Sequence, residues 1–376
     1  MLGLYIHVPF CSAICNYCNF NRGLFDADLK ESYVRALISE IQSAISNQQS
    51  AIAADTIYFG GGTPSLLESD EIARIIAACE SSFAVAADRE VTLEANPETV
   101  TQARLAAFRA AGVNRLSVGV QSLNEAELKR LSRLHSAERA RAAVAEGRAA
   151  GFDNLSLDLM MWLPEQGVSD WAETIDGAIA LEPDHLSLYL LEVYPNAPLK
   201  EEMARAQWSQ APDEDAATMY LTAMERLTAA GLGQYEISNV AKPGRRSRHN
   251  LKYWTDGEWL GFGCGAHSTR AGVRWKNVAS TEDYVQRIAN DKSPAIDRRR
   301  LSADERLGDA LFMGLRLNDG VDLTAVNTRY GVDVWERFGR ELQPFVDAGI
   351  LVREGTQMRL TREGMLVAHT VMSVFV

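Results

Sequence analysis

Short apolar runs alternate with amphipathic stretches along the first half of the chain. Six of these runs are rich in β-branched and aromatic residues, at residues 4–8, 56–61, 91–95, 115–121, 155–161 and 185–193. Because the runs are nearly continuously apolar, we expect strands that are buried on both faces. Such strands, separated by helices, predict a parallel sheet with right-handed crossovers.

The segments between these runs carry helix signals. In residues 69–79 apolar side chains recur at helical spacing, so Ser69 can cap a helix and Cys79 is predicted to be a core residue. Thr101 can open the next helix, and Gly112 can close it in the left-handed conformation. Six strand-helix units predict an α/β fold, either a complete barrel or an incomplete (β/α)6 TIM-like barrel, whose chemistry lies at the carboxyl ends of the strands.

The composition changes after about residue 240. Residues 241–295 are rich in glycine and aromatic residues, and a charged stretch then leads into a helical pattern. We therefore predict a barrel over 1–240, an extension and linker over 241–295, and a small, mainly helical C-terminal domain over 296–376. Within this last domain, the pattern near 350–361 is typical of a hairpin.

The overall composition limits the class of protein. The chain has 376 residues, a formal net charge of -12 and a pI of about 5.1. This acidic balance argues against binding to nucleic acid, which requires a basic face. No apolar run approaches the roughly 20 residues needed to cross a bilayer, and the first residues do not resemble a signal peptide. We expect a cytoplasmic protein.

Three of the five cysteines lie in one predicted loop directly after the first strand. Cys11, Cys15 and Cys18 have C-x3-C-x2-C spacing, so one loop can place three thiolates around an iron-sulfur cluster. Such clusters normally have four cysteine ligands, and three would leave one iron open. A zinc site is an alternative, although structural zinc requires four ligands, and a reactive thiol pair is another.

A glycine run ends the second predicted strand. Gly60, Gly61 and Gly62 precede Thr63, and without side chains their backbone N-H groups can approach a small charged ligand. Glycines at a strand end often serve only a turn. Beside an open cluster, however, the run lies where a ligand that chelates the open iron would be.

The cysteine spacing, with Tyr17 before Cys18, and the sequence GGGTPS together resemble the radical S-adenosylmethionine (SAM) superfamily. The resemblance implies a radical SAM barrel and a 4Fe-4S cluster whose open iron chelates the methionine part of SAM. It also implies an electron donor for the cluster. In such proteins the cofactor carries the difficult chemistry, and the protein positions it.

Further segments resemble the branch that contains oxygen-independent coproporphyrinogen III oxidase, namely LEANPE, NRLSVGVQS, LSRLH and LDLMMWLP. The resemblance implies that Glu94 and Arg133 contact one SAM molecule, and that Gln121 and Asp158 contact a second. Carboxylates and amides can bind ribose hydroxyls, and arginine can pair with a carboxylate. Structural ion pairs and strand-end hydrogen bonds are the alternative for each residue.

This chain departs from the branch at one loop. Met161 and Trp162 stand where the branch usually has Tyr-Gly. A tryptophan in place of glycine fills space that a backbone or ligand would otherwise occupy. The departure counts against a second SAM molecule.

Two other features resemble the HemW-like haem chaperones within this branch. The oxidase pattern has a fourth cysteine where this chain has Phe20, and only ten residues precede Cys11. The H-N-x-x-Y-W sequence that begins at His249 also resembles the HemW signature. This resemblance implies that haem is cargo for apo-haemoproteins of respiration, and hence that the protein makes peripheral contact with the inner membrane.

The segment around His249 has side chains suited to haem. His249 can ligate iron, Tyr253 and Trp254 can pack on a flat macrocycle, and neighbouring arginines can pair with propionates. A solvated basic loop with a buried aromatic anchor is the alternative. Further along, we interpret Cys264 as structural and leave His267 without a role.

The sequence therefore favours a haem chaperone that binds a cluster and SAM. Two alternatives are radical enzymes, one that decarboxylates the propionates of a porphyrinogen and one that acts on another tetrapyrrole, because fold and cluster are shared across many chemistries. A zinc-binding module is the third alternative. The absent fourth cysteine counts against the oxidase.

Overall fold

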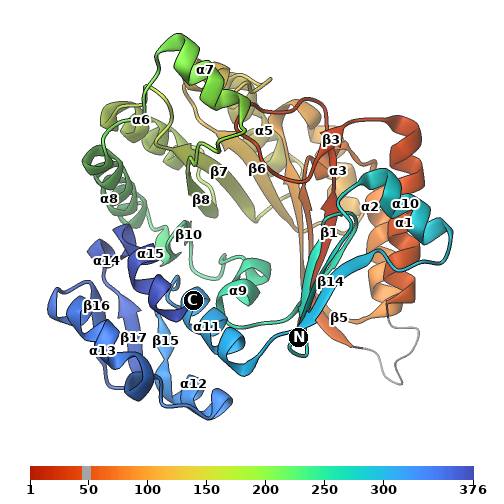
Figure 1. The fold of residues 1–376 in the computed structure, drawn as a ribbon. Helices are drawn as coiled ribbons and strands as arrows, with labels where there is room; N and C mark the ends of the chain where they lie inside the picture. Colours follow the sequence, from red (N-terminus) through yellow and green to blue (C-terminus); the bar gives the residue numbers. More distant parts are fainter. Residues whose placement is uncertain (45–51) are drawn as a thin grey trace.

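Six parallel strands form the centre of the computed structural model, which describes residues 1–44 and 52–376 (Figure 1). They lie side by side in the order β1 (Leu2–Val8), β4 (Ala53–Gly61), β5 (Ala84–Ala95), β6 (Arg115–Gln121), β7 (Leu155–Met161) and β8 (His185–Leu190). Each contains or overlaps one of the six predicted runs, so the predicted α/β partial barrel is confirmed. Strand β8 ends before 193 because its partner β7 ends at Met161, opposite Leu190.

The sheet continues past the barrel at both edges. Beside β1 come β11 (Trp259–Phe262), β12 (His267–Arg270), β13 (Val273–Asn277) and β14 (Ala295–Arg300). Strand β11 is parallel to β1, and the following pairs are antiparallel. Beside β8 come β10 (Asn239–Ala241) and β9 (Gly233–Glu236). Much of the segment 241–295 therefore adds strands to the sheet that begins in the barrel.

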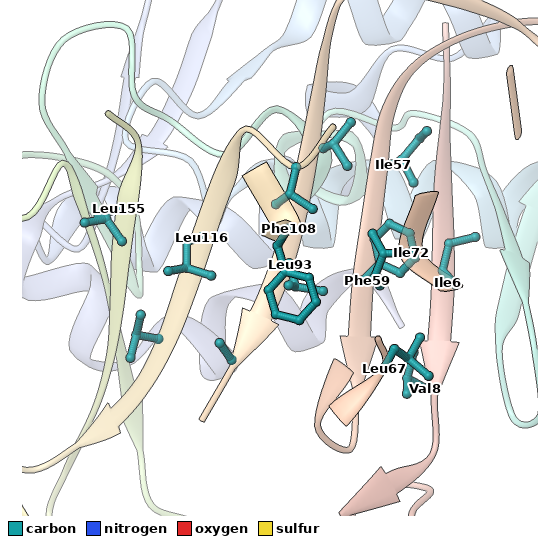
Figure 2. Close-up of a cluster of buried hydrophobic side chains, with 14 of the residues drawn as sticks. Ile6, Val8, Ile57, Phe59, Leu67, Ile72, Leu93, Phe108, Leu116 and Leu155 are labelled. Carbon is teal, nitrogen blue, oxygen red and sulfur yellow. The ribbon is translucent and has the colours of Figure 1, made fainter. Parts of the chain in front are cut away.

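Helices cover the outer face of the barrel. They are α1 (Ala27–Ser43), α2 (Ser69–Ser82), α3 (Gln102–Ala110), α5 (Ala137–Ala149), α6 (Val168–Ile179) and α8 (Asp213–Ala229). Apolar side chains of the strands and helices meet between the two layers, as Figure 2 shows for Ile57, Phe59, Leu93, Ile72 and Phe108. Because one face of each strand is used in this way, the other face is left to line the barrel lumen.

Local signals account for the helix ends. Thr101 caps α3 by accepting a hydrogen bond from the backbone of Arg104, and Gly112 follows with φ +110°. Cys79 is fully buried. These three predictions are confirmed, but the prediction that Ser69 caps α2 is wrong. The helix already begins at Ser69, because the Glu71 carboxylate accepts from the N-H of Glu68 one residue earlier.

The C-terminal part has its own small core. It contains α11 (Ala303–Gly314), α12 (Leu323–Tyr330), α13 (Val334–Asp347), α14 (Arg362–Leu366) and α15 (Ala368–Met372), with the strands β15 (Val321–Asp322), β16 (Leu351–Glu354) and β17 (Gln357–Leu360). Strands β16 and β17 form the predicted hairpin. Helix α9 (Arg248–Trp254) lies against α11, between this part and the barrel (Figure 1).

Within residues 1–44 and 52–376, no helix is both long enough and apolar enough to cross a bilayer.

Candidate functional site

The cysteine loop follows β1 and is closed at its base by a short pair of strands. These are β2 (Phe10–Cys11) and β3 (Gly23–Leu24), which run parallel. Phe10 is buried and packs edge to face on Tyr33, which fixes the start of the loop against α1. Both ends of the loop are therefore attached to the barrel.

The three thiols of this loop face a common region. Cys11 is buried, and the pKa of its thiol is raised mainly by that burial and further by the nearby Cys18 and Cys15. Cys15 and Cys18 are partly exposed. In the described ranges, no three His, Cys, Asp or Glu side chains are grouped closely enough to hold a single metal ion. This donor set does not form the four-ligand site that structural zinc requires, whereas a cubane binds each thiolate at a different iron.

The glycine run packs directly against this loop. A Cβ atom at Gly62 would lie 3.0 Å from Cys11 Sγ and 2.7 Å from the carbonyl oxygen of Phe10. At Gly61, which has φ +117°, a Cβ would lie 2.6 Å from the His7 ring. Glycine is therefore required at both positions by close approach, and at Gly61 also by the backbone conformation.

The backbone N-H groups of the run bind protein rather than remaining free. Gly61 donates to Glu94 Oε2 at 3.2 Å, Gly62 to the Val8 carbonyl at 2.7 Å and Thr63 to the Phe10 carbonyl at 2.8 Å. In this conformation these three N-H groups therefore have protein acceptors. The run instead allows close approach to the cysteine loop, because a Cβ would collide with it.

Two carboxyl groups face the lumen inside the barrel. Glu94 accepts a hydrogen bond from the Tyr58 hydroxyl at 2.7 Å, and Asp158 accepts one from Ser117 at 3.2 Å. Desolvation raises the pKa of Glu94 to about 7 and that of Asp158 to about 6. Both side chains nevertheless keep partial contact with solvent. Groups that are accessible yet surrounded by protein mark the lining of an open lumen.

Arg133 connects the lumen residues to the cysteine loop. Its guanidinium donates to Asn96 Oδ1 at 2.9 Å and to the Gly119 carbonyl at 3.0 Å, and it lies 3.6 Å from Cys15 Sγ. Asn96 in turn donates to Thr63 Oγ1 at 3.1 Å. One hydrogen-bonded network therefore runs from the glycine run to the cysteines. Sequence reasoning did not assign Asn96, although it lies within the LEANPE motif.

Gln121 ends β6 in a strained backbone conformation. Its φ is +65°, which is uncommon outside glycine and tends to persist where the surroundings or a function require it. A Cβ at Gly119 would lie 3.1 Å from Gln121 Nε2 and 3.6 Å from an Arg133 nitrogen, so the two side chains lie on one side of the strand end. The structure thus brings Gln121 close to Arg133.

The backbone of Trp162 is left-handed, with φ +62°, a conformation that is uncommon for any residue other than glycine. Its indole N-H donates to the carbonyl of Ala211 at 2.7 Å. The side chain is therefore held by the segment that precedes α8.

Arg115 is a lumen residue that sequence reasoning missed. It begins β6, its side chain is fully buried, and its charge lowers the pKa of Asp158 against the larger effect of desolvation. In the part of the chain that the structure describes, the guanidinium forms no hydrogen bond or ion pair. The signal that could have revealed it is an arginine at the start of an otherwise apolar strand, because a charge there must face the lumen.

His249 lies at the amino end of the strands, where its ring stacks on Tyr58 with centroids 5.0 Å apart. Its ring is buried, with Nδ1 2.8 Å from Thr56 Oγ1 and Nε2 2.9 Å from the Tyr253 hydroxyl. Desolvation lowers its pKa to about 3. Because both ring nitrogens already have protein partners, this arrangement argues against the prediction that His249 ligates haem iron.

The arginines of the same segment are also engaged. Arg245, Arg246 and Arg248 each face an aspartate, at 3.5 Å, 3.6 Å and 3.3 Å. In this conformation they are paired with the protein's own carboxylates rather than left for propionates.

Comparison of the sequence and fold with known proteins shows which class of protein this chain belongs to. Residues 5–178 match the family described as the radical SAM superfamily, and residues 301–367 match the HemN C-terminal domain. The fold is similar to that of coproporphyrinogen III oxidase (HemN) from Escherichia coli, with a TM-score of 0.87 and 23% identity over 100% of this chain and 89% of that one. The chain is therefore a radical SAM protein, and this superfamily implies a 4Fe-4S cluster and SAM.

Curated relatives narrow the class to one family. The chain is 33% identical to the heme chaperone HemW of Bacillus subtilis over 376 residues, which cover 100% of this chain and 99% of that protein. It is 36% identical to the heme chaperone HemW of Mycobacterium tuberculosis over 373 residues, which cover 98% and 93%. The chain belongs to the HemW family.

Proposed function

We propose that this protein is a haem chaperone that holds a 4Fe-4S cluster and SAM in its barrel and delivers haem to apo-haemoproteins of respiration. The observation that carries the proposal is the similarity to HemW chaperones along the entire chain, C-terminal domain included. We place the protein in the cytoplasm, with peripheral contact at the inner membrane where such recipients reside. An electron donor for the cluster completes the set of partners.

The residues at the carboxyl ends of the strands suit the implied cofactors. Cys11, Cys15 and Cys18 would each bind a different iron of the cluster, which supplies the single electron that SAM cleavage requires. The glycine run Gly60–Gly62 and Thr63 adjoin Cys11, so a ligand on the open iron would meet them. Arg133, which lies beside Cys15, would offset part of the negative charge of the thiolates.

The lumen side chains would bind the rest of SAM. Glu94 would accept hydrogen bonds from ribose hydroxyls, and Arg133 would pair with a carboxylate. Gln121 and Asp158 would contact a second ligand deeper in the lumen. With pKa values of about 7 and 6, Glu94 and Asp158 can change protonation near neutral pH.

The intact lumen also favours a second candidate function, a radical SAM enzyme that acts on a tetrapyrrole. Inside the barrel, Arg115 provides a cation that can pair with an anionic substrate, and Asp158 provides a carboxyl group that can transfer a proton near neutral pH. Against this candidate, Phe20 stands where the oxidase pattern has its fourth cysteine, and its side chain is exposed on the loop.

An anaerobic haem titration tests the proposal. Cluster-reconstituted protein is mixed with haem, desalted and examined by visible absorption, and the retained haem is then offered to an apo-haemoprotein. We expect about one haem per chain to survive desalting and to transfer. Loss of haem on desalting would refute the chaperone, and turnover of coproporphyrinogen III by the same preparation would establish the enzyme instead.

A further inference from the structure

A cavity of about 520 Å³ lies between the sheet extension and the C-terminal domain. Its walls come from four parts of the chain: the end of α9, strands β11 to β13, helix α11 and the end of α12. This volume falls within the range of clefts that hold small molecules and cofactors. None of the residues that we assign to the cluster or to SAM lines it, so it is a separate site.

Aromatic rings form one wall of this cavity. Tyr253 packs edge to face on Trp259, with ring centroids 4.7 Å apart, and on Trp254, with centroids 6.1 Å apart. Met313 and Tyr330, from α11 and α12, also line the cavity. Aromatic and thioether side chains are suited to an apolar aromatic ligand.

His267 supplies a free imidazole at the same cavity. The side chain is exposed, and its ring forms no hydrogen bond within residues 1–44 and 52–376. The rings of the other five histidines all have hydrogen-bond partners: His7, His135, His185, His249 and His369. Partial burial lowers the pKa of His267, and Lys276 and Arg274 lower it further, so the ring is neutral at pH 7. A neutral ring nitrogen without a partner is what an iron ligand requires.

Three arginines and three carboxylates line the cavity, and among the described residues one of these arginines has no direct ion-pair or hydrogen-bond partner. Arg274 pairs with Asp309 at 2.7 Å, and Arg329 pairs with Asp256 at 3.0 Å. The carboxylate of Glu258 accepts from a backbone N-H. The guanidinium of Arg306 lies 6.0 Å from the Tyr330 ring and forms no ion pair or hydrogen bond in the described part of the chain. Arg306 can therefore pair with an anionic group of a ligand.

We infer that this cavity binds haem, with His267 as an axial ligand to the iron and Arg306 paired with a propionate. The inference rests on the proposed function, because haem is the cargo of the proposed chaperone. Aromatic side chains, one free imidazole and one guanidinium without a direct partner together match an iron porphyrin, which is aromatic, requires an axial ligand and carries carboxylates. The cargo would thus lie beside the C-terminal domain, outside the lumen that holds the cluster.

Spectral titration of the full-length protein with haem tests this site. Replacing His267 with alanine should weaken haem binding at least about tenfold and shift the Soret band, because an axial ligand is lost. His369→Ala, which removes an exposed histidine elsewhere, should change neither. The His267→Cys variant should restore binding with the spectrum of a thiolate ligand, which a purely structural role would not produce.

A second pair of variants tests the propionate contact. Arg306→Ala should weaken haem binding several-fold without moving the Soret band, whereas Arg340→Ala on the exposed face of α13 should have no effect. If the wild-type protein retains haem while the His267 and Arg306 variants bind it unchanged, the site is wrong but the chaperone function stands. If the wild-type protein binds no haem, the proposed function itself fails and the inference falls with it.

Discussion

The two regions that we assign to ligands are built in different ways. At the carboxyl end of the barrel, the site residues lie in or after the strands β1, β4, β5, β6 and β7, and a local motif marks each segment. The cavity beside the C-terminal domain draws on residues from Tyr253 to Tyr330, which no single motif contains. A site at strand ends can thus be recognised from local sequence motifs. A site between two parts of a chain cannot, because it depends on how these parts pack.

The two regions also differ in how far their charged groups are buried. The barrel lumen surrounds Glu94 and Asp158 with protein, and desolvation shifts their pKa values upward. The cavity instead has ion pairs that remain partly exposed, such as Arg274 with Asp309. Exposed pairs contribute little to stability because water screens them. Substitutions in the lumen should therefore change stability and its pH dependence, whereas substitutions in the cavity should change ligand binding alone.

The largest effect is expected in the cysteine loop. Replacing Cys15 with serine should remove most of the cluster iron after anaerobic reconstitution, at least about a tenfold loss, because thiolates are the normal ligands of such clusters. Iron analysis and the brown absorption of the cluster measure the loss. Cys79→Ala, which deletes a thiol from the core beneath α2, should keep the iron. Full iron retention by the Cys15 variant would contradict our ligand assignment.

The next largest effect is expected at the glycine run. Alanine at Gly61 should cost about 3 kcal/mol of unfolding free energy, because the residue has φ +117° and the new Cβ would meet the His7 ring. That ring cannot easily move, because its two nitrogens lie 3.1 Å from the Tyr5 hydroxyl and 2.8 Å from the Asn21 carbonyl. The affinity of the Gly61→Ala variant for SAM, measured by calorimetry, should also be lower than that of the wild-type protein.

A matched glycine separates crowding from backbone strain. Gly151 has φ +90°, but a Cβ there would have no atom within 4 Å. Gly151→Ala should therefore cost only about 1 kcal/mol, the strain alone. Equal costs for the two variants would mean that close approach to β1 is not what requires glycine at Gly61.

The strands of the barrel could be predicted because burial acts on every residue of a central strand. A strand such as β6, with helices on one face and the lumen on the other, must be nearly free of charge along its length. The cysteine spacing was equally readable, since the three residues share one loop. Arg115 was harder to predict, because its place at the start of β6 is the one local signal that separates a lumen-facing arginine from one that precedes the strand.

The choice between two histidines shows most clearly what the sequence could not supply. In the sequence, His249 has the neighbours that better suit a haem ligand, Tyr253 and Trp254. Its ring, however, is bound to Thr56, which lies 193 residues away in the sequence. His267 remained unassigned because the arginine and aromatic residues around its cavity come from α9, α11 and α12. Which ring nitrogens are free is a property of long-range packing.

A smaller effect is expected from Glu94, through pH. Its pKa is raised from 4.5 to about 7, so protonation favours the folded state. The stabilisation is fully present below about pH 4.5 and is lost as the pH rises through about 7. Relative to Glu94→Gln, the wild-type protein should lose about 2 kcal/mol between pH 5 and pH 8, somewhat less than the full shift because the carboxyl keeps partial solvent contact.

Urea unfolding at several pH values measures this difference. Glu40, whose pKa is also raised to about 7 by burial against Tyr284 and the start of the sheet extension, provides the comparison. Glu40→Gln should show the same direction of pH dependence without any effect on SAM binding. A difference between wild type and Glu94→Gln that stays constant with pH would contradict the raised pKa.

The smallest expected change in stability comes from a histidine, and it gives the sharpest test of the comparison between the barrel and the cavity. The test compares alanine variants of two histidines, one from each region. His249→Ala should lower the unfolding free energy by about 1–2 kcal/mol, since it removes buried hydrogen bonds to Thr56 and Tyr253, while the Soret band of bound haem stays in place. His267→Ala should do the reverse, with stability within about 0.5 kcal/mol of wild type and an altered haem spectrum. Should His249→Ala alone shift the haem spectrum, the packing seen here would have to open when haem binds, and the cargo site would move to the amino end of the barrel.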